Sequence, residues 1–290
     1  MDRRQATSYS TSLDLPHLPT LSPWSTLSTH HHACNLLAAD GTLATLVSEV
    51  VGNGPFHIVV PGTRFDRLSD QSQVEWYDGQ LRVGHLTIGL QSGRPWNPRL
   101  PSLSSQTSFA PLLAHLTQMQ NESALYSGTP ALTERAQRGI GSLQAGVIKR
   151  DFQLIEQGIT LLAGLGPGLT PAGDDFLLGF LAALAVLPEQ SNTGQDLRHL
   201  IVRCASPRTT RLSAAWLYHA GQSQFGELWH ELINALNHDH HIAVQQAADA
   251  IATTGATSGV DALCGFRAGI EIVRSTPTSR FTPPATPHSA

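Results

Sequence analysis

The segment Gly164-Leu-Gly-Pro-Gly-Leu-Thr-Pro-Ala-Gly-Asp-Asp175, followed by the apolar run Phe176–Leu187, decides how the second half of the chain folds. Glycine permits backbone conformations that other residues resist, so the first part predicts a turn. Thr170 suits an N-cap and Pro171 the first helical position, and acidic residues follow in the first turn. We therefore expect a glycine-rich turn that opens onto a buried helix beginning at Pro171.

A turn of this kind has a functional and a purely structural interpretation. Its unpaired amides lie beside the positive end of a helix dipole, which favours a phosphate or carboxylate ligand. Asp174 and Asp175 argue partly against this, because they bring negative charge to the same place unless they point away, hold a cation or accept protons. The alternative is ordinary helix capping, since loose glycine motifs often match by chance.

Two further segments have the character of helix starts. Gly255-Ala-Thr-Ser-Gly-Val-Asp261 repeats the order of small residues, hydroxyl and acid ahead of a helix through Val273, which suggests an approximate internal duplication. Thr209-Thr-Arg-Leu-Ser213 follows Pro207 and precedes another helical stretch, and its arginine can pair bidentately with an anion. Three such starts make an anion site only if the fold brings them together.

The predicted site combines these three segments. Its substrate-binding residues are Gly166, Gly168, Thr170, Thr209, Thr210, Arg211, Ser213, Thr257, Ser258 and Gly259, and its catalytic candidates are Asp174, Asp175 and Asp261. Asp174 and Asp175 are also the candidate ligands of a Mg²⁺ ion. Gly179 and Gly265 each follow an acid by one helical turn, and Gly269 extends a small-residue face, so we expect the two acidic helices to cross closely.

The rest of the chain predicts an α+β protein, with a small N-terminal antiparallel β-sheet or partial barrel followed by a mostly helical C-terminal domain. Asp40-Gly41 and Asp78-Gly79 are turn pairs between strand-like segments, whereas helical periodicity begins at Ala110. We expect a loose Ser, Thr and Pro-rich tail over 1–28, a β-rich domain over 29–90, a linker over 91–109, a helical domain over 110–274 and a disordered tail over 275–290.

Composition excludes several classes of protein. Lys and Arg number 18 against 22 acidic residues, a net charge of −4, so no basic stripe is available to follow nucleic acid. The apolar run Phe176–Leu187 is too short to span a bilayer, and the N-terminal residues lack the apolar core of a secretory signal. Three widely spaced cysteines predict neither disulfides nor a thiolate zinc site, and Cys34 and Cys264 are expected to be packing residues. The expected location is the cytoplasm.

Other catalytic and metal motifs are weak. His30–His32 is interpreted as a solvated run, because consecutive side chains alternate in direction before a strand. His238, His240 and His241 cluster before a helix, but no Cys or acid at a fixed spacing supports a zinc site. No Gly-x-Ser-x-Gly elbow is present, so a serine triad is not predicted.

These residues resemble a known family. Gly164–Leu184, Thr209–Leu217 and Gly255–Gly269 are similar, in order and spacing, to three signature blocks of the AllH-like subunit of oxamate carbamoyltransferase. The resemblance extends from about His32 to Ile272 and is stronger in the helical half. Arg211 departs from the pattern, so its role as a ligand depends on its charge alone.

The resemblance implies a subunit of a multi-subunit enzyme of anaerobic allantoin use, which interconverts oxalurate plus phosphate and oxamate plus carbamoyl phosphate. All of these ligands are anions, in agreement with the amide-rich helix starts. The implied partners are these small anions and the other subunits, with no nucleic acid and no membrane. Two alternatives stay open: a non-catalytic scaffold or anion-binding protein, and a related enzyme of another ureido or carbamoyl compound.

Overall fold

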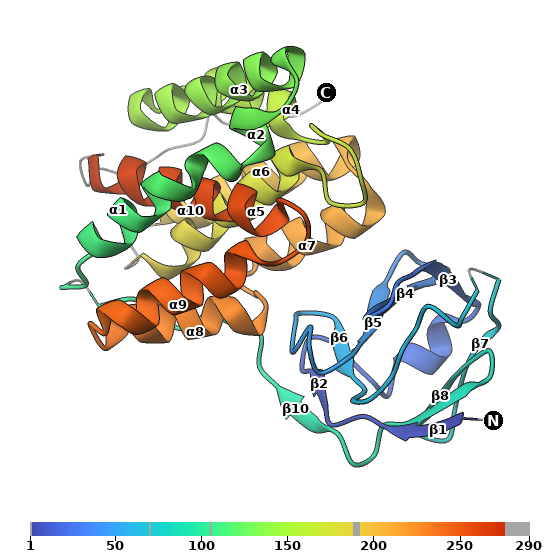
Figure 1. Cartoon of the computed structure of the whole chain (residues 1–290). Helices are drawn as coiled ribbons and strands as arrows, with labels where there is room; N and C mark the ends of the chain where they lie inside the picture. The colour runs from blue at the N-terminus through green and yellow to red at the C-terminus, as the bar shows by residue number, and fades with distance from the viewer. Residues whose placement is uncertain (1, 70, 105, 188–191, 276–290) are drawn as a thin grey trace. The chain divides into compact units, whose positions relative to one another are not determined.

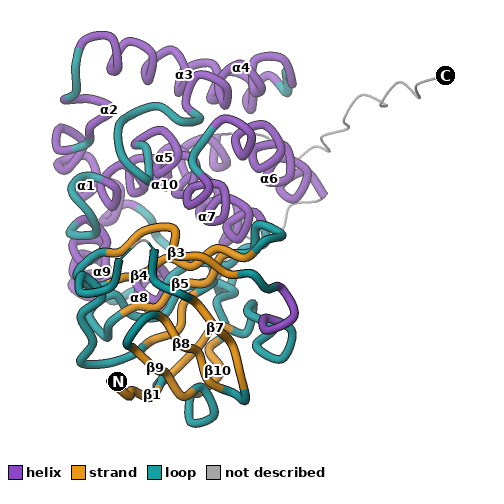
Figure 2. Tube along the Cα trace, turned by 90° about the vertical axis from the view of Figure 1, so that its right-hand side faces the viewer, coloured by secondary structure: helices purple, strands orange, loops and turns teal. Residues whose placement is uncertain are grey.

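The computed structural model describes residues 2–69, 71–104, 106–187 and 192–275. The chain forms two compact units, and each is described by itself. The β-rich unit comprises the residues up to Arg99 together with Phe225–Glu227, and the helical unit comprises Leu100–Gln224 together with the described residues from Leu228 onward. Figure 2 shows the strands in one unit and the long helices in the other. The predicted α+β class is therefore confirmed.

The described part of the β-rich unit contains a 10-stranded mixed sheet in the order β1-β9-β8-β7-β3-β4-β5-β6-β2-β10. In chain order the strands are β1 (Asp2–Gln5), β2 (Ser8–Ser10), β3 (Trp24–Thr29), β4 (Ala33–Ala38), β5 (Leu43–Val47), β6 (His57–Val59), β7 (Val74–Tyr77), β8 (Gln80–Val83), β9 (Leu86–Gly89) and β10 (Arg94–Trp96). A short 3-10 helix, η1 (Leu18–Leu21), precedes β3. The pairs β1–β9, β5–β6 and β2–β10 are parallel, so the sheet is mixed rather than purely antiparallel.

The first residues of the chain make this sheet a partial barrel (Figure 1). β1 pairs with β9 at one end of the strand order, whereas β2, three residues further on, pairs with β6 near the other end. The short connection donates to both sides, from Ala6 N to Gly89 O and from Thr7 N to Val59 O. A single segment can reach both ends only if the sheet curls until they meet.

Residues 1–28 were expected to form a loose tail, and the structure corrects this over the described residues 2–28. The backbone amides of Asp2, Ala6, Thr7 and Thr11 donate to carbonyls that lie between fifty and ninety positions later in the chain, so local composition carries no sign of this pairing. The expected linker over 91–109 also differs, since β10 belongs to the β-rich unit and Leu100 already begins the helical one. The expected C-terminal tail lies outside the described residues, apart from Ser275 at the end of the last helix.

The two predicted hairpin turns are present. β4 and β5 pair across Asp40-Gly41, where Gly41 has φ of +93°, and β7 and β8 pair across Asp78-Gly79. After Gly79, buried and more exposed residues alternate along β8. The alternation ends at Gly84, whose φ of +56° turns the chain back into β9.

The helical unit is built around a helix that is apolar on nearly every side. Helix α5 (Ala172–Val186) packs against α10 (Ser258–Ser275), α7 (Arg211–Gly221), α6 (Asn192–Ala205) and α4 (Phe152–Leu162). The remaining helices are α1 (Ala110–Met119), η2 (Gln120–Glu122), α2 (Ala124–Ser127), α3 (Pro130–Lys149), η3 (Ser206–Arg208), α8 (Glu227–Asn237) and α9 (His241–Ala252). An apolar helix covered by neighbours on all sides is the expected centre of a helical core.

Helices α5 and α10 cross at the close distance that their glycines predict. A Cβ atom at Gly179 would overlap the carbonyl oxygen of Ala262, and one at Gly265 would overlap that of Phe176. Each helix therefore presents a glycine to the backbone of the other. Among the described residues, no helix combines the length and apolar character that a membrane crossing requires.

Candidate functional site at three helix starts

The glycine-rich turn lies between α4 and α5. Gly164, Gly166 and Gly168 have φ of +68°, +117° and +94°, values that L side chains rarely adopt. Helix α5 begins at Ala172, one residue later than predicted, with Pro171 in the N-cap position and no side-chain cap. Thr170 therefore does not cap this helix, and its hydroxyl is free to bond elsewhere.

Asp174 connects the two ends of the turn and the start of α7. Its Oδ1 accepts a hydrogen bond from Gly164 N at 2.9 Å, and its Oδ2 accepts one from the hydroxyl of Thr209. Burial raises the pKa of Asp174, and the bonds from Thr209 and Gly164 oppose that rise. Both carboxylate oxygens thus have protein donors, which hold Asp174 between the glycine-rich turn and the start of α7.

The start of α7 holds the tip of the turn. Thr210 is its N-cap, accepting from Ser213 N at 3.1 Å, and the Thr210 hydroxyl donates to Leu169 O at 2.5 Å. The Ser213 hydroxyl donates to the same carbonyl at 3.3 Å. Arg211 is exposed and has no ion pair within the described part of the chain. The hydroxyls predicted to bind substrate therefore position the turn, while the arginine remains available.

The start of α10 reaches the turn from a third direction. Thr170 Oγ1 lies 3.1 Å from Ser258 Oγ, which joins the turn to the first residue of α10. Thr257 stands in the N-cap position, since its carbonyl accepts from Asp261 N at 2.8 Å. Gly259 serves packing, because its amide donates to Thr254 O and a Cβ there would overlap the carbonyl of Ile251. The three predicted helix starts do converge.

Asp175 and Asp261 form a buried carboxyl pair at the first turns of α5 and α10. Asp175 is 8% exposed and Asp261 is 0% exposed. Asp261 Oδ1 accepts from the hydroxyl of Ser123 at 2.5 Å, whereas Oδ2 of each aspartate has no hydrogen-bond partner among the described residues. The sequence analysis missed Ser123, which is fully buried and is also the N-cap of α2. A serine directly before a short helical stretch was the only local sign of it.

The electrostatics of this pair favour neutral carboxyl groups. Burial raises the pKa of Asp175 well above its ordinary value, the hydroxyl of Ser258 opposes the rise, and the charges of Asp261 and Asp174 add to it. Burial also raises the pKa of Asp261, against the bonds from Ser123 and Thr257. The pKa of Cys264 is raised to about 11 by burial and then by Asp261, so this thiol stays protonated and packs as predicted.

The tip of the turn remains open to a ligand. Pro167, Gly168 and Leu169 are exposed, and a Cβ at Gly168 would meet no atom within 4 Å. Within the described residues the amides of Gly166 and Gly168 make no hydrogen bond, whereas that of Gly164 is bound to Asp174. The arrangement offers backbone donors and one arginine to an anion, on a frame fixed by threonine and serine hydroxyls.

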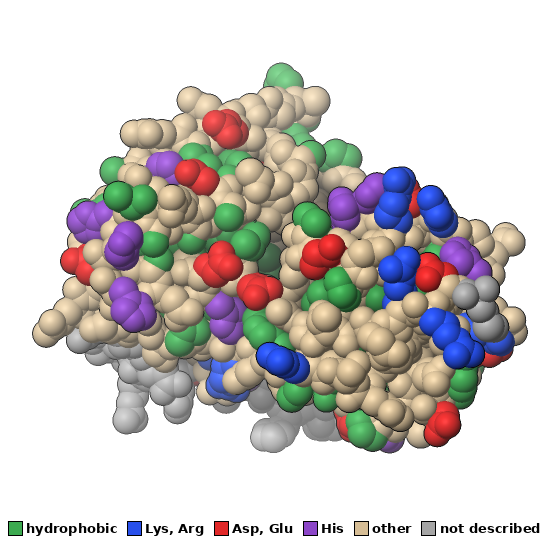
Figure 3. Space-filling model, turned by 60° about the horizontal axis from the view of Figure 1, so that its bottom comes forward, with side chains coloured by type: hydrophobic (Ala, Val, Ile, Leu, Met, Phe, Trp, Pro, Cys, Tyr) green, Lys and Arg blue, Asp and Glu red, His purple; other side chains and the backbone are tan. Residues whose placement is uncertain are grey.

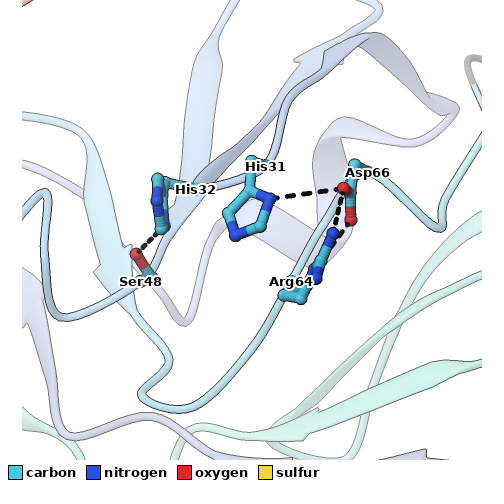
Figure 4. A network of polar contacts seen from close by, with 5 residues as sticks. All are labelled: His31, His32, Ser48, Arg64 and Asp66. Atoms are coloured by element: carbon cyan, nitrogen blue, oxygen red, sulfur yellow. Dashed lines mark hydrogen bonds and ion pairs between the residues drawn. The ribbon is translucent and has the colours of Figure 1, made fainter.

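Among the described residues, the histidines do not assemble into a metal centre. His31 and His32 are exposed as predicted, but each has a partner: His31 Nδ1 lies 3.3 Å from Asp66 Oδ2, and His32 Nδ1 lies 3.0 Å from Ser48 Oγ (Figure 4). His240 caps α9 by accepting from Ala243 N at 3.2 Å. The part of the chain that the structure describes holds no group of three His, Cys, Asp or Glu side chains suited to a metal ion.

Comparison with known families matches both units. Residues 162–270 match the family described as oxamate carbamoyltransferase subunit AllH, a range that includes all three helix starts. Residues 25–95 match the AllH family N-terminal domain, which corresponds to most of the β-rich unit. No solved structure matches the chain. Since the two matches together cover more than half of the sequence, the chain belongs to the AllH family of oxamate carbamoyltransferase subunits.

Proposed function

We propose that the turn at Gly166–Gly168, with Arg211, binds a small anionic substrate of a carbamoyltransferase complex in the cytoplasm. The reaction is oxalurate plus phosphate to oxamate plus carbamoyl phosphate, and its reverse, in the use of allantoin nitrogen. A phosphate oxygen forms a bond to the carbamoyl carbon while the bond from that carbon to the oxamate nitrogen breaks, and the nitrogen takes up a proton. The convergence of three helix starts on one exposed turn is the observation that supports this proposal most directly.

The residues divide into two roles in this proposal. The amides of Gly166 and Gly168 and the Arg211 side chain contact the anion, since they are the donors that have no protein partner among the described residues. Stabilising negative charge in this way supplies much of what phosphate chemistry needs. Asp175 and Asp261 are positioning residues, because their burial keeps them from a ligand at the turn. A Mg²⁺ ion, if the reaction uses one, would need oxygen ligands from the substrate or from other subunits.

Gly168→Ala tests the proposal, and the chain supplies a matched control. Gly168 and Gly41 have nearly the same φ, +94° and +93°, and a Cβ at either meets no atom within 4 Å. Both substitutions therefore introduce similar backbone strain, but only the first places a methyl group beside the proposed anion. We expect Gly168→Ala to lower carbamoyl transfer by the assembled complex at least about tenfold, the effect of weakening one charge-assisted contact, and Gly41→Ala to leave it unchanged.

A second pair of variants tests Arg211. Arg211→Gln should raise the phosphate concentration needed for half-maximal activity, whereas Arg138→Gln, at an exposed position on α3, should not. Equal activity of Gly168→Ala and Gly41→Ala complexes, with normal thermal unfolding of both chains, would contradict the anion site.

The second candidate function is a non-catalytic scaffold, which is favoured by the fact that the hydroxyls of Thr209, Thr210 and Ser213 all bond to the protein itself. Thermal unfolding of the chain can be followed with phosphate, carbamoyl phosphate, oxamate and oxalurate, each with and without Mg²⁺. A ligand of the native state raises the midpoint. A rise that Gly168→Ala abolishes supports the site; normal complex activity of both Gly168→Ala and Arg211→Gln favours the scaffold.

A further inference from the structure

We propose that the β-rich unit carries a second anion site, a pocket for one small oxyanion of phosphate or carboxylate type. The pocket has a volume of about 120 Å³ and lies between strand β1, the segment 62–68 and the turn at 84–86. Its polar lining comes mainly from Arg4, Arg64, Arg67 and His85, with Asp2 as the acidic member. Figure 3 shows Arg side chains (blue) gathered over this unit, at the right of the view. This site is independent of the function proposed above.

Arg4 supplies the first unsatisfied donor. Its Nε lies 3.1 Å from Asp2 Oδ1, within ion-pair distance, yet this buried nitrogen makes no hydrogen bond within the described residues. Its Nη2 donates to Asp2 Oδ2 at 3.3 Å, a long contact on the same side of the guanidinium. Its Nη1 lies beside Gly62, where a Cβ would be 3.7 Å away. Because Gly62 also lines the pocket, this end of Arg4 is placed at its wall.

Arg67 supplies the second donor. Its side chain lines the pocket and has no ion pair or hydrogen bond among the described residues. Arg64 is held differently: its Nη2 lies 2.8 Å from Asp66 Oδ2, and Figure 4 shows the side chain turned toward that carboxylate. Arg64 is therefore largely neutralised, whereas Arg67 brings an uncompensated positive charge.

The charge balance around the pocket leaves room for one anion. Arg4 is paired with Asp2 and Arg64 with Asp66, so of the three arginines that line the pocket only Arg67 has no carboxylate partner among the described residues. The carboxylate of Glu49 is not part of the pocket lining, and its Oε2 accepts a hydrogen bond from the backbone amide of Gly62 at 2.9 Å. A guanidinium fork matches the geometry of a carboxylate or phosphate and binds either in a bidentate manner.

Volume restricts the size of the ligand. Pockets for cofactors and drug-sized ligands measure roughly 300–1,000 Å³, well above the 120 Å³ found here. A nucleotide does not fit in such a space, whereas a single phosphate or carboxylate group does. The donors available, two guanidinium groups and the His85 ring, suit an oxyanion better than a neutral molecule.

The test is calorimetric titration of the full chain with inorganic phosphate at constant ionic strength, carried out in the Gly168→Ala background. That background removes the site proposed in the helical unit, so any phosphate binding that remains is attributed to the pocket in the β-rich unit. Arg67→Gln should weaken phosphate binding by about tenfold or more, as expected for the loss of a charged donor. Arg67→Lys keeps the positive charge but loses the forked geometry of the guanidinium group, so its affinity for phosphate should lie between those of the unsubstituted Arg67 chain and Arg67→Gln.

Arg3→Gln is the matched control, because Arg3 is exposed on the same strand as Arg4 but is not part of the pocket lining. It changes the net charge by the same amount, so an effect of overall charge alone would appear in both variants. Retained binding in Arg3→Gln with loss in Arg67→Gln supports the pocket. Equal affinities in Arg67→Gln and Arg3→Gln, or absence of phosphate binding at millimolar concentration in the Gly168→Ala chain, would overturn it.

Discussion

At the scale of single residues, Asp175 and Asp261 are carboxyl groups in a place that tolerates ions poorly. Each has one buried oxygen without a hydrogen-bond partner among the described residues, and the charge of Asp261 adds to the effect of burial in raising the pKa of Asp175. A buried carboxyl that lacks compensating donors takes up a proton more readily than it does in water. Protonation of Asp175 therefore lowers the electrostatic cost of burying it beside Asp261.

The first prediction concerns the pH dependence that this pair produces. The pKa of Asp175 in the folded chain lies above the ordinary value of 3.8. Between the ordinary pKa and the higher pKa of the folded chain, the native state binds more protons than the unfolded state. The free energy of unfolding therefore falls as pH rises through the folded pKa. Asp175→Asn removes the group that must ionise. We expect it to raise the thermal midpoint at pH 8, and the gain to shrink as the pH approaches 4.

Glu134→Gln provides the control, because Glu134 is exposed on α3 and its substitution removes the same charge. Its thermal midpoint should follow that of the wild type at every pH. If Asp175→Asn is less stable than the wild type at pH 8, the carboxylate is charged and compensated, contrary to the interpretation above.

At the scale of elements, the crossing of α5 and α10 determines where the site lies. Gly179 and Gly265 each admit the backbone of the opposite helix, and this close approach places both N-termini beside the turn. The second prediction is that Gly179→Ala destabilises the chain by about 1–3 kcal/mol or more, since an added methyl group in a packed core forces backbone shifts. Chemical denaturation of the purified chain measures this loss.

Gly141→Ala is the matched substitution. Gly141 lies inside α3, and a Cβ there meets no atom within 4 Å. Alanine at an unstrained helical position stabilises by about 0.4–1 kcal/mol, because it restricts the unfolded chain. The two changes, chemically identical, should therefore have opposite signs. A gain in stability from Gly179→Ala would refute the close crossing.

At the scale of the whole molecule, the chain contains two cores of different architecture. The sheet of the β-rich unit is closed by the first residues of the chain. This unit also includes the short segment Phe225–Glu227, which comes from the helical part of the sequence. Glu227 Oε2 accepts from both the amide and the side chain of Asn53, at 2.9 Å and 3.0 Å. Each unit therefore has its own buried residues and its own hydrogen bonds.

The third prediction follows from these two cores: calorimetric unfolding of the full chain should be resolved into two transitions. Gly179→Ala should lower only the transition of the helical unit. Leu46→Ala, at a fully buried position in β5, should lower only the transition of the β-rich unit. The expected loss in that unit's free energy of unfolding is about 2–5 kcal/mol. A single transition that moves with both substitutions would show that the units unfold together.

The features that depend on near neighbours could be predicted from the amino-acid sequence. The Asp40-Gly41 and Asp78-Gly79 turns, the apolar character of α5 and the glycine faces of α5 and α10 were all predicted, because turn chemistry and side-chain periodicity act over a few residues. The AllH resemblance was visible for the same reason, since its blocks are contiguous.

The features that join distant residues could not be predicted in this way, because they depend on how the chain folds. Residues 2–10 close the sheet by pairing with residues far along the chain, such as Val59 and Gly89. Because these partners are distant in the sequence, composition alone indicated a tail. The roles of the site residues depended on the fold in the same way. The Thr209 hydroxyl is directed to Asp174, and Ser123 to Asp261, across 35 and 138 positions. A helix start presents similar donors whatever lies opposite, and only packing determines which of them remain for a ligand.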